Sequence, residues 1–153
     1  MDLAAQTATG VASIAAIRDV FGGAGSDSLL GNDQNNVFRG GPGNDTINGR
    51  NGVDTLDESN ATLNLTVNLN NTSAQSTGLG DDTIIAIENL FTGSGNDVLT
   101  GDGADNLLSG GLGDDSYYFL DHWGLDGVQD PDGQDSLYFT DVTVDLNFNL
   151  AAS

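Results

Sequence analysis

Residues 22–57 read GGAGSDSLLGNDQNNVFRGGPGNDTINGRNGVDTLD, a run of four nine-residue repeats that begin at Gly22, Gly31, Gly40 and Gly49. Every repeat places Asp or Asn at its sixth position, which we call the aspartate slot, and a large apolar residue at its eighth position. A period of nine is too short for a helical repeat, and it fits a glycine-rich turn followed by a short strand. The stretch therefore predicts an all-β repeat structure.

A second copy of the pattern lies seventy residues further along the chain, where Thr92 stands in the place of Gly22. It reads TGSGNDVLT, GDGADNLLS and GGLGDDSYY, and TGLGDDTII from Thr77 precedes it as one further repeat. Such a long match marks a duplicated unit. We therefore divide the chain into residues 1–76, a first roll unit with an interrupting strand segment, and residues 77–153, a second roll unit with a C-terminal cap.

The apolar eighth positions of the two copies indicate how the repeats pack. These residues are Leu29, Phe38, Ile47, Leu56, Leu99, Leu108 and Tyr117. One inward-facing apolar side chain per strand buries too little surface for a strand to be stable alone. Successive strands must therefore stack, so that the eighth-position side chains form an apolar ladder inside a solenoid.

The composition excludes several classes of partner. The chain has 22 glycines, no cysteine, three basic residues and a formal net charge of −20. So few basic residues cannot neutralise the phosphates of a nucleic acid or the head groups of anionic lipids. A hydrophobic fraction of 37% is too high for an acidic disordered tail, so a bound cation is the simplest compensation for the charge. No run of about 18 apolar residues occurs, and we expect no membrane span.

The repeats resemble the pattern G-G-x-G-x-D-x-U-x of RTX (repeat-in-toxin, haemolysin-type) calcium-binding proteins. GGAGSD, GGPGND, TGSGND and GGLGDD match it closely, whereas GNDQNN and GDGADN have Asn36 and Asn106 in the slot. The resemblance implies a parallel β-roll, in which each repeat is half a coil and several Ca²⁺ ions lie between the turns of repeats n and n+2. It also implies an extracellular bacterial protein, secreted by a type I system, that folds when calcium binds.

The same arrangement pairs acidic side chains eighteen residues apart, as Asp27 with Asp45 and Asp97 with Asp115. Calcium takes about six to eight oxygen ligands, both carboxylates and carbonyls. The predicted side-chain ligands are Asp27, Asp45, Asp54, Asp82, Asp97, Asp115, Asp126, Asp135, Asn36 and Asn106. By resemblance, carbonyl ligands come from the turn residues Gly22, Ala24, Gly41, Gly43, Gly111 and Gly113.

Three parts of the chain depart from the period. Asp126 and Asp135 follow Asn106 and Asp115 by twenty residues, which predicts a two-residue insertion near FLDHW. Residues 58–76 alternate apolar and polar side chains from Leu63 to Leu69, which predicts an ordinary strand at the edge of the roll. Residues 142–150, VTVDLNFNL, alternate in the same way and predict a closing strand.

The sequence leaves more than one function open. We expect a calcium-binding module without enzymatic activity, because an aspartate that recurs at a repeat position is typical of a metal ligand. The alternative is a structural or adhesive protein that associates head to tail into calcium-dependent filaments or matrix. A third hypothesis, an accessory that acts on carbohydrate or ice, has little support, because turn positions three and five are irregular.

Overall fold

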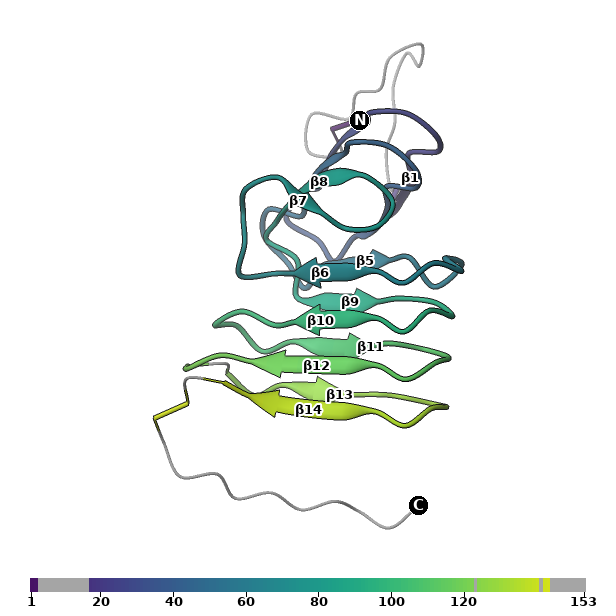
Figure 1. Ribbon diagram of the computed structural model, residues 1–153. Coiled ribbons are helices and arrows are strands. Elements are labelled where there is room, and N and C mark those ends of the chain that lie inside the picture. Colours follow the sequence, from purple (N-terminus) through teal and green to yellow (C-terminus); the bar gives the residue numbers. More distant parts are fainter. Residues whose placement is uncertain (3–16, 123, 141, 144–153) are drawn as a thin grey trace.

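The computed structural model describes residues 1–2, 17–122, 124–140 and 142–143 of the chain. All regular elements in these residues are β-strands, which stack into a roll with one layer of strands on each side (Figure 1). The same residues include no helix of the length and apolarity needed to cross a membrane. Most of the closing strand expected in residues 142–150 lies outside the described residues.

Each nine-residue repeat forms one turn and one short strand. The strands are β1 (Asp19–Phe21), β2 (Ser28–Leu30), β3 (Val37–Arg39), β4 (Thr46–Asn48), β5 (Thr55–Asp57), β6 (Thr66–Asn68), β7 (Gln75–Ser76), β8 (Asp81–Ile85), β9 (Asn89–Phe91), β10 (Val98–Thr100), β11 (Leu107–Ser109), β12 (Ser116–Phe119), β13 (Gly127–Val128) and β14 (Ser136–Phe139). Ser28 pairs with Thr46, and Val37 with Thr55, so a coil of the first unit contains two repeats.

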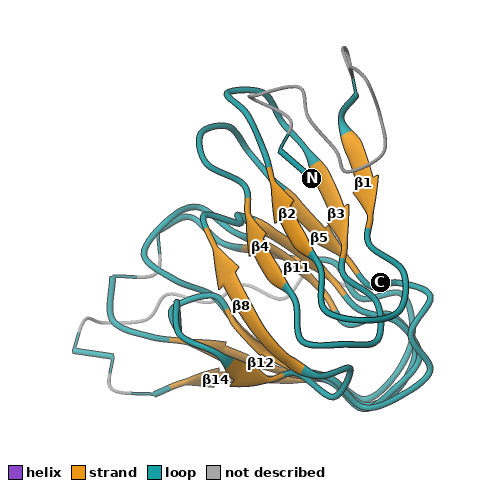
Figure 2. Cartoon of the chain, turned by 90° about the horizontal axis from the view of Figure 1, so that it is seen from above, coloured by secondary structure: helices purple, strands orange, loops and turns teal. Residues whose placement is uncertain are grey.

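The strands form two faces. One face is a six-stranded parallel sheet with the order β1-β3-β5-β9-β11-β13. The opposite face consists of two sheets, β2-β4-β8-β7 and β6-β10-β12-β14, in which only the pairing of β7 with β8 is antiparallel. The strand direction turns progressively along the stack, as the view from above shows (Figure 2). The predicted parallel β-roll is therefore confirmed.

The eighth-position side chains fill the space between the two faces. Phe38, Leu90, Leu99, Leu108 and Tyr117 have no exposed surface (0%). The strand register places Leu56, Leu90 and Leu108 directly above one another. Because every coil adds its own apolar side chain to one continuous cluster, the apolar ladder is the core of the roll.

The two-residue insertion near residue 120 is confirmed. Ser116 pairs with Ser136 and Leu107 pairs with Gly127, so this coil is two residues longer than the coils of the first unit. His122 adopts a φ of 64°, in the left-handed region that non-glycine residues rarely enter. The longer turn restores the register, so that the last two strands continue both faces.

The interrupting segment contributes the edge strand of the sheet β6-β10-β12-β14, at mid-height in the roll and not at one of its ends. Its strand β6 pairs in parallel with β10 and lies next to β5 at mid-height (Figure 1). Val67 and Leu69 are buried in the core, whereas Leu63 is 56% exposed. The strand is shorter than expected, and these apolar side chains extend the ladder.

The two units exchange strands at the interrupting segment. β8 stacks on β4 of the first unit and β6 stacks on β10 of the second, although β6 precedes β8 in the sequence. The side-chain amide of Gln75 in β7 bridges the two sheets, accepting the Asn68 N–H at 2.8 Å and donating to the Asn68 carbonyl at 2.9 Å. The division at residue 76 stays a prediction about sequence units, and the sheets run across it.

Candidate metal centres

The turns form two rows along the edges of the roll. The first turn row leads into the strands of the divided face, and the second turn row leads into β3, β5, β9, β11 and β13. In stacking order, the slots of the first row contain Asp27, Asp45, Asp82, Leu65, Asp97, Asp115 and Asp135. The slots of the second row contain Asn36, Asp54, Glu88, Asn106 and Asp126. All ten predicted side-chain ligands therefore lie in these two rows.

One hydrogen bond to the neighbouring coil fixes most slot carboxylates. Oδ1 of Asp45 accepts the backbone N–H of Asp27 at 2.8 Å, and Oδ1 of Asp115 accepts that of Asp97 at 2.7 Å. The same bond joins Asn36 to Asp54, Asp45 to Asp82, Leu65 to Asp97, Asn106 to Asp126 and Asp115 to Asp135. The backbone of one coil thus orients the carboxylate of the next and leaves the second oxygen available.

The second oxygen of six slot aspartates is buried and has no hydrogen-bond partner among the described residues. These atoms are Oδ2 of Asp27, Asp45, Asp54, Asp97, Asp115 and Asp126. A buried charged oxygen is costly unless a positive group compensates it. The ion pairs of the described residues join Arg39 to Asp57 and Arg50 to Asp2, and neither reaches a slot. A bound cation is the compensation that these six oxygens lack.

The first glycine of the repeat leaves room at these oxygens. A Cβ atom at Gly40 would lie 2.4 Å from Oδ2 of Asp45, and one at Gly110 would lie 1.9 Å from Oδ2 of Asp115. Any larger residue would occupy the space beside the carboxylate. Hard oxygen ligands with open space beside them fit Ca²⁺, which prefers carboxylates and carbonyls in a flexible geometry.

Burial raises the pKa of the slot carboxylates. The pKa of Asp54, Asp115 and Asp126 rises to about 6, because burial disfavours the charged form more than the hydrogen bond from the neighbouring coil favours it. The pKa of Asp45 rises for the same first reason, and the charges of Asp82 and Asp27 add to the effect. Without a cation, these carboxylates therefore keep a proton up to a higher pH in the folded roll than in the unfolded chain.

The metal-free chain is expected to gain β-structure in acid. The pKa of about 6 in the fold exceeds the unfolded value of about 3.9, so the folded state binds more protons between these values. The free energy of unfolding should therefore rise as the pH falls from about 6 to about 4, and this gain should be lost as the pH rises through about 6. Circular dichroism of the metal-depleted chain between pH 7 and pH 4.5 would measure it, and a loss of β-signal on acidification would contradict it.

In the two slots that contain asparagine, the side-chain oxygen already accepts a hydrogen bond from a backbone N–H of its own turn. Oδ1 of Asn36 accepts the N–H of Asn32 at 2.9 Å, and Oδ1 of Asn106 accepts the N–H of Asp102 at 2.8 Å. Each amide oxygen thus closes its own turn, whereas an aspartate in the slot binds the neighbouring coil. Asn36 and Asn106 lie where predicted, but their oxygens already have a partner within the turn.

The first turn row is interrupted where the units exchange strands. Asp82 is buried, and its Oδ2 accepts a hydrogen bond of 2.5 Å from the hydroxyl of Thr77, which replaces the first glycine of that repeat. The next slot contains Leu65, which is 1% exposed. Asp82 therefore differs from the six open aspartates, because a hydroxyl group takes the place beside its carboxylate.

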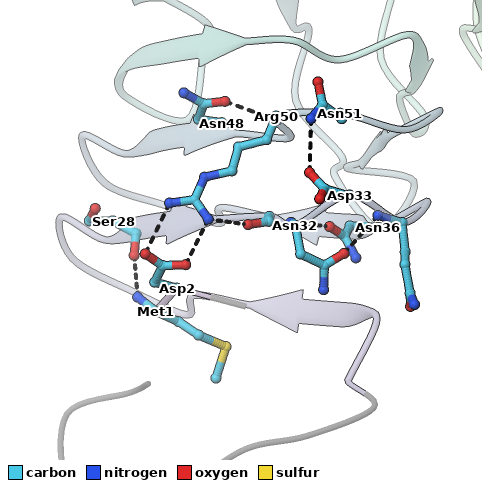
Figure 3. A network of polar contacts seen from close by, with 11 residues as sticks. Met1, Asp2, Ser28, Asn32, Asp33, Asn36, Asn48, Arg50 and Asn51 are labelled. Carbon is cyan, nitrogen blue, oxygen red and sulfur yellow. Dashed lines mark hydrogen bonds and ion pairs between the residues drawn. The ribbon is translucent and has the colours of Figure 1, made fainter. Parts of the chain in front are cut away.

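An arginine lies in the second turn row beside the degenerate repeat (Figure 3). Arg50, with a φ of 73°, donates to the Gly31 carbonyl at 2.9 Å and to both carboxylate oxygens of Asp2 at 2.9 and 3.0 Å. Its guanidinium group thus supplies positive charge next to the turn that contains Asn36. This first coil combines a neutral slot with a cation of the protein itself.

The predicted carbonyl ligands lie in the first turn row. The carbonyls of Gly43 and Gly113 point along the stack, since a Cβ atom at Gly80 or Gly133 in the following coil would lie 1.8 Å from them. Gly41 and Gly111 lie against the preceding coil in the same way. The carbonyls of these four residues, and those of Gly22 and Ala24, stay predicted ligands.

Two acidic residues that bond the backbone of a neighbouring coil were not among the residues predicted from the repeat pattern. Glu88 occupies a slot of the second row, where its Oε2 accepts the N–H of Asp54 at 2.7 Å. Its position follows from the apolar Leu90 two residues later, but no glycine-rich turn precedes it. Glu58 is buried and its Oε1 accepts the N–H of Gly40 at 2.8 Å. It lies eighteen residues after Gly40, so the one-coil spacing that relates Asp27 to Asp45 would have indicated this contact.

Comparison with known families agrees with this geometry. Residues 21–56 and 87–117 match the RTX calcium-binding nonapeptide repeat, in four copies. No curated protein and no solved structure is significantly similar to the chain. The matched ranges contain five of the six open aspartates and apolar ladder residues of both copies, whereas Asp82, Asp126 and Asp135 lie outside them. Asp27, Asp45, Asp54, Asp97 and Asp115 lie inside.

Proposed function

Because the chain contains RTX calcium-binding nonapeptide repeats, we propose that it is an extracellular module that folds into its roll when calcium binds. The observation that supports this proposal most directly is the set of six buried slot oxygens without a partner. RTX repeats are typical of secreted bacterial proteins, which supports a location outside the cell and export through a type I system. Calcium is abundant there, so binding and folding follow secretion.

The energetics favour coupling between calcium and folding. Two carboxylates held about 4 Å apart repel each other by roughly 1–4 kcal/mol near a protein surface. Several such contacts are comparable with the whole stability of a small domain, about 5–15 kcal/mol. Bound calcium removes this repulsion and binds only the folded arrangement, so its binding free energy adds to the stability of the roll.

We assign no catalytic activity to the chain. Asp45, Asp97 and Asp115 are buried, and the carboxylate of each accepts a backbone N–H, as that of Asp115 accepts the N–H of Asp97. Such carboxylates are oriented towards the neighbouring coil and not towards a substrate cleft. Their arrangement supports ion binding.

The proposal predicts a calcium-driven transition from coil to β-structure. Circular dichroism of the full chain at pH 7 should show a largely unfolded chain in chelator and a β-spectrum at about millimolar calcium. Magnesium at the same concentration should not replace calcium, because it demands octahedral geometry and gives up its water reluctantly. Equal β-content with chelator and with calcium would refute the proposal.

A pair of variants tests the assigned register in the same titration. Asp45→Asn removes a charge from an open slot and should raise the calcium midpoint. Asp33→Asn removes an exposed charge outside the slots, whose carboxylate accepts a hydrogen bond from the Asn51 side chain. Equal midpoints for the two variants would show that the slots are assigned wrongly. Light scattering of the calcium-loaded chain tests the alternative function, since filaments would be far larger than 15.7 kDa.

A further inference from the structure

The last coil contains an acidic residue that the repeat pattern does not explain. Asp130 stands at the first position of the final repeat, twenty residues after Gly110 at the same position of the preceding coil. The repeats of the two copies, from Gly22 to Gly110, have glycine or threonine at this position, and the repeat before β13 has Asp121. A side chain here reaches the space beside the slot carboxylate, which a glycine such as Gly40 or Gly110 leaves open.

Asp130 forms a cluster with two slot aspartates. One carboxylate oxygen each of Asp115, Asp130 and Asp135 lies within 4.8 Å of the others. Asp115 is 1% exposed, and its Oδ2 is buried without a hydrogen-bond partner. A buried oxygen without a partner and two further carboxylates thus converge on one point. No basic side chain of the described residues forms an ion pair with them.

Tyr117 holds Asp130 in this position. Tyr117 is the one ladder residue of the two copies with a hydroxyl group, which accepts the N–H of Gly110 at 2.7 Å and donates to Oδ2 of Asp130. The N–H of Asp132 donates to the other oxygen of Asp130 at 3.3 Å. The carboxylate is therefore oriented from two sides and keeps lone pairs for a cation.

We propose that Asp115, Asp130 and Asp135 form a three-carboxylate cation site that binds calcium more tightly than the slots with two aspartates. The inference rests on the proposed calcium function and adds a specific ligand set to it. The affinity of a calcium site rises with the number of charged ligands, and three carboxylates attract a divalent ion more strongly than two. A trivalent lanthanide, which is also a hard cation, should prefer this site still more.

Asp130→Asn in the full chain tests the site, with Asp132→Asn as the matched control. Both substitutions remove one charge from the same turn, but the carboxylate of Asp132 is exposed and lies outside the cluster. Calcium titration by calorimetry should show that Asp130→Asn weakens the tightest site about tenfold or more, and that Asp132→Asn changes it less than about twofold. Equal affinities of the two variants would overturn the proposal.

A measurement on the unaltered chain tests the site without relying on a variant that folds. All three tyrosines, Tyr117, Tyr118 and Tyr138, lie in β12 and β14. The first equivalent of terbium(III) should therefore give emission sensitised by tyrosine, and calcium should displace it. Emission that appears only after later equivalents would place the tightest site elsewhere and overturn the inference. If the chain bound no calcium at all, the proposed function itself would fail, which is a distinct result.

Discussion

Replacing Gly113 with alanine should strongly destabilise the calcium-loaded roll. Gly113 adopts a φ of 120°, and a Cβ atom there would lie 2.1 Å from the Gly95 carbonyl oxygen of the preceding coil. The left-handed conformation alone costs an alanine about 1–3 kcal/mol, and overlap with a backbone atom adds about 1–3 kcal/mol. The sum is a large part of the stability of a small domain. Chemical denaturation at saturating calcium, followed by circular dichroism, would measure it.

Gly25→Ala is the matched control for this substitution. Gly25 occupies the same turn position in the first coil and has a similar φ of 110°, but a Cβ atom there would meet nothing within 4 Å. It should therefore show the conformational cost without the overlap, about 1–3 kcal/mol. If the two variants lost equal stability, the close approach of successive coils would not be what requires glycine at Gly113.

Leu90→Ala should cause the second large loss. Leu90 is fully buried and lies between Leu56 and Leu108 in the apolar ladder, at the height where the two units meet. Truncating a buried leucine to alanine lowers the free energy of unfolding by about 2–5 kcal/mol, because apolar contacts are lost and a cavity is left. The same denaturation experiment would show the loss as a lower free energy of unfolding at saturating calcium.

An exposed leucine provides the control for Leu90. Leu125 is 84% exposed in the turn before β13, and Leu125→Ala should change the free energy of unfolding by less than about 0.5 kcal/mol. A loss for Leu90→Ala as small as that for Leu125→Ala would mean that the ladder does not stabilise the roll. A calcium affinity that falls together with stability would show that core and turns fold as one unit.

The sequence predicted those parts of the fold that depend on a fixed period. Asp27 and Asp45 are eighteen residues apart, which is one coil, and their turns are neighbours. The same spacing pairs Leu29 with Ile47, so the eighteen-residue period predicts both the slots and the apolar ladder. The insertion before Asp126 was also predictable, because the slot and the following apolar residue keep their distance.

The remaining features depend on contacts between residues that no period relates. The bond from Thr77 to Asp82 closes one slot, and the local bond of Asn36 to Asn32 closes another, but both residues fit the pattern as ligands. The stacking of β8 on β4 involves a spacing of thirty-seven residues, because the interrupting segment contributes a strand to the other unit. Asp130 was missed because its partner Tyr117 belongs to the core of another coil.

The strand exchange between β6 and β8 bears on how the molecule would respond to a mechanical pull. A solenoid held at its ends can unwind one coil at a time, since each coil contacts only its neighbours. Here the chain returns to β4 after it has already contributed β6 to the sheet of β10. Force applied from the C-terminal side would peel β14 to β9 in sequence and then meet β8, which is held between β4 and β7. Removing β8 requires its pairings with β4 and β7 to break at the same time. Unwinding should therefore occur in two stages, separated by the higher force needed to remove β8.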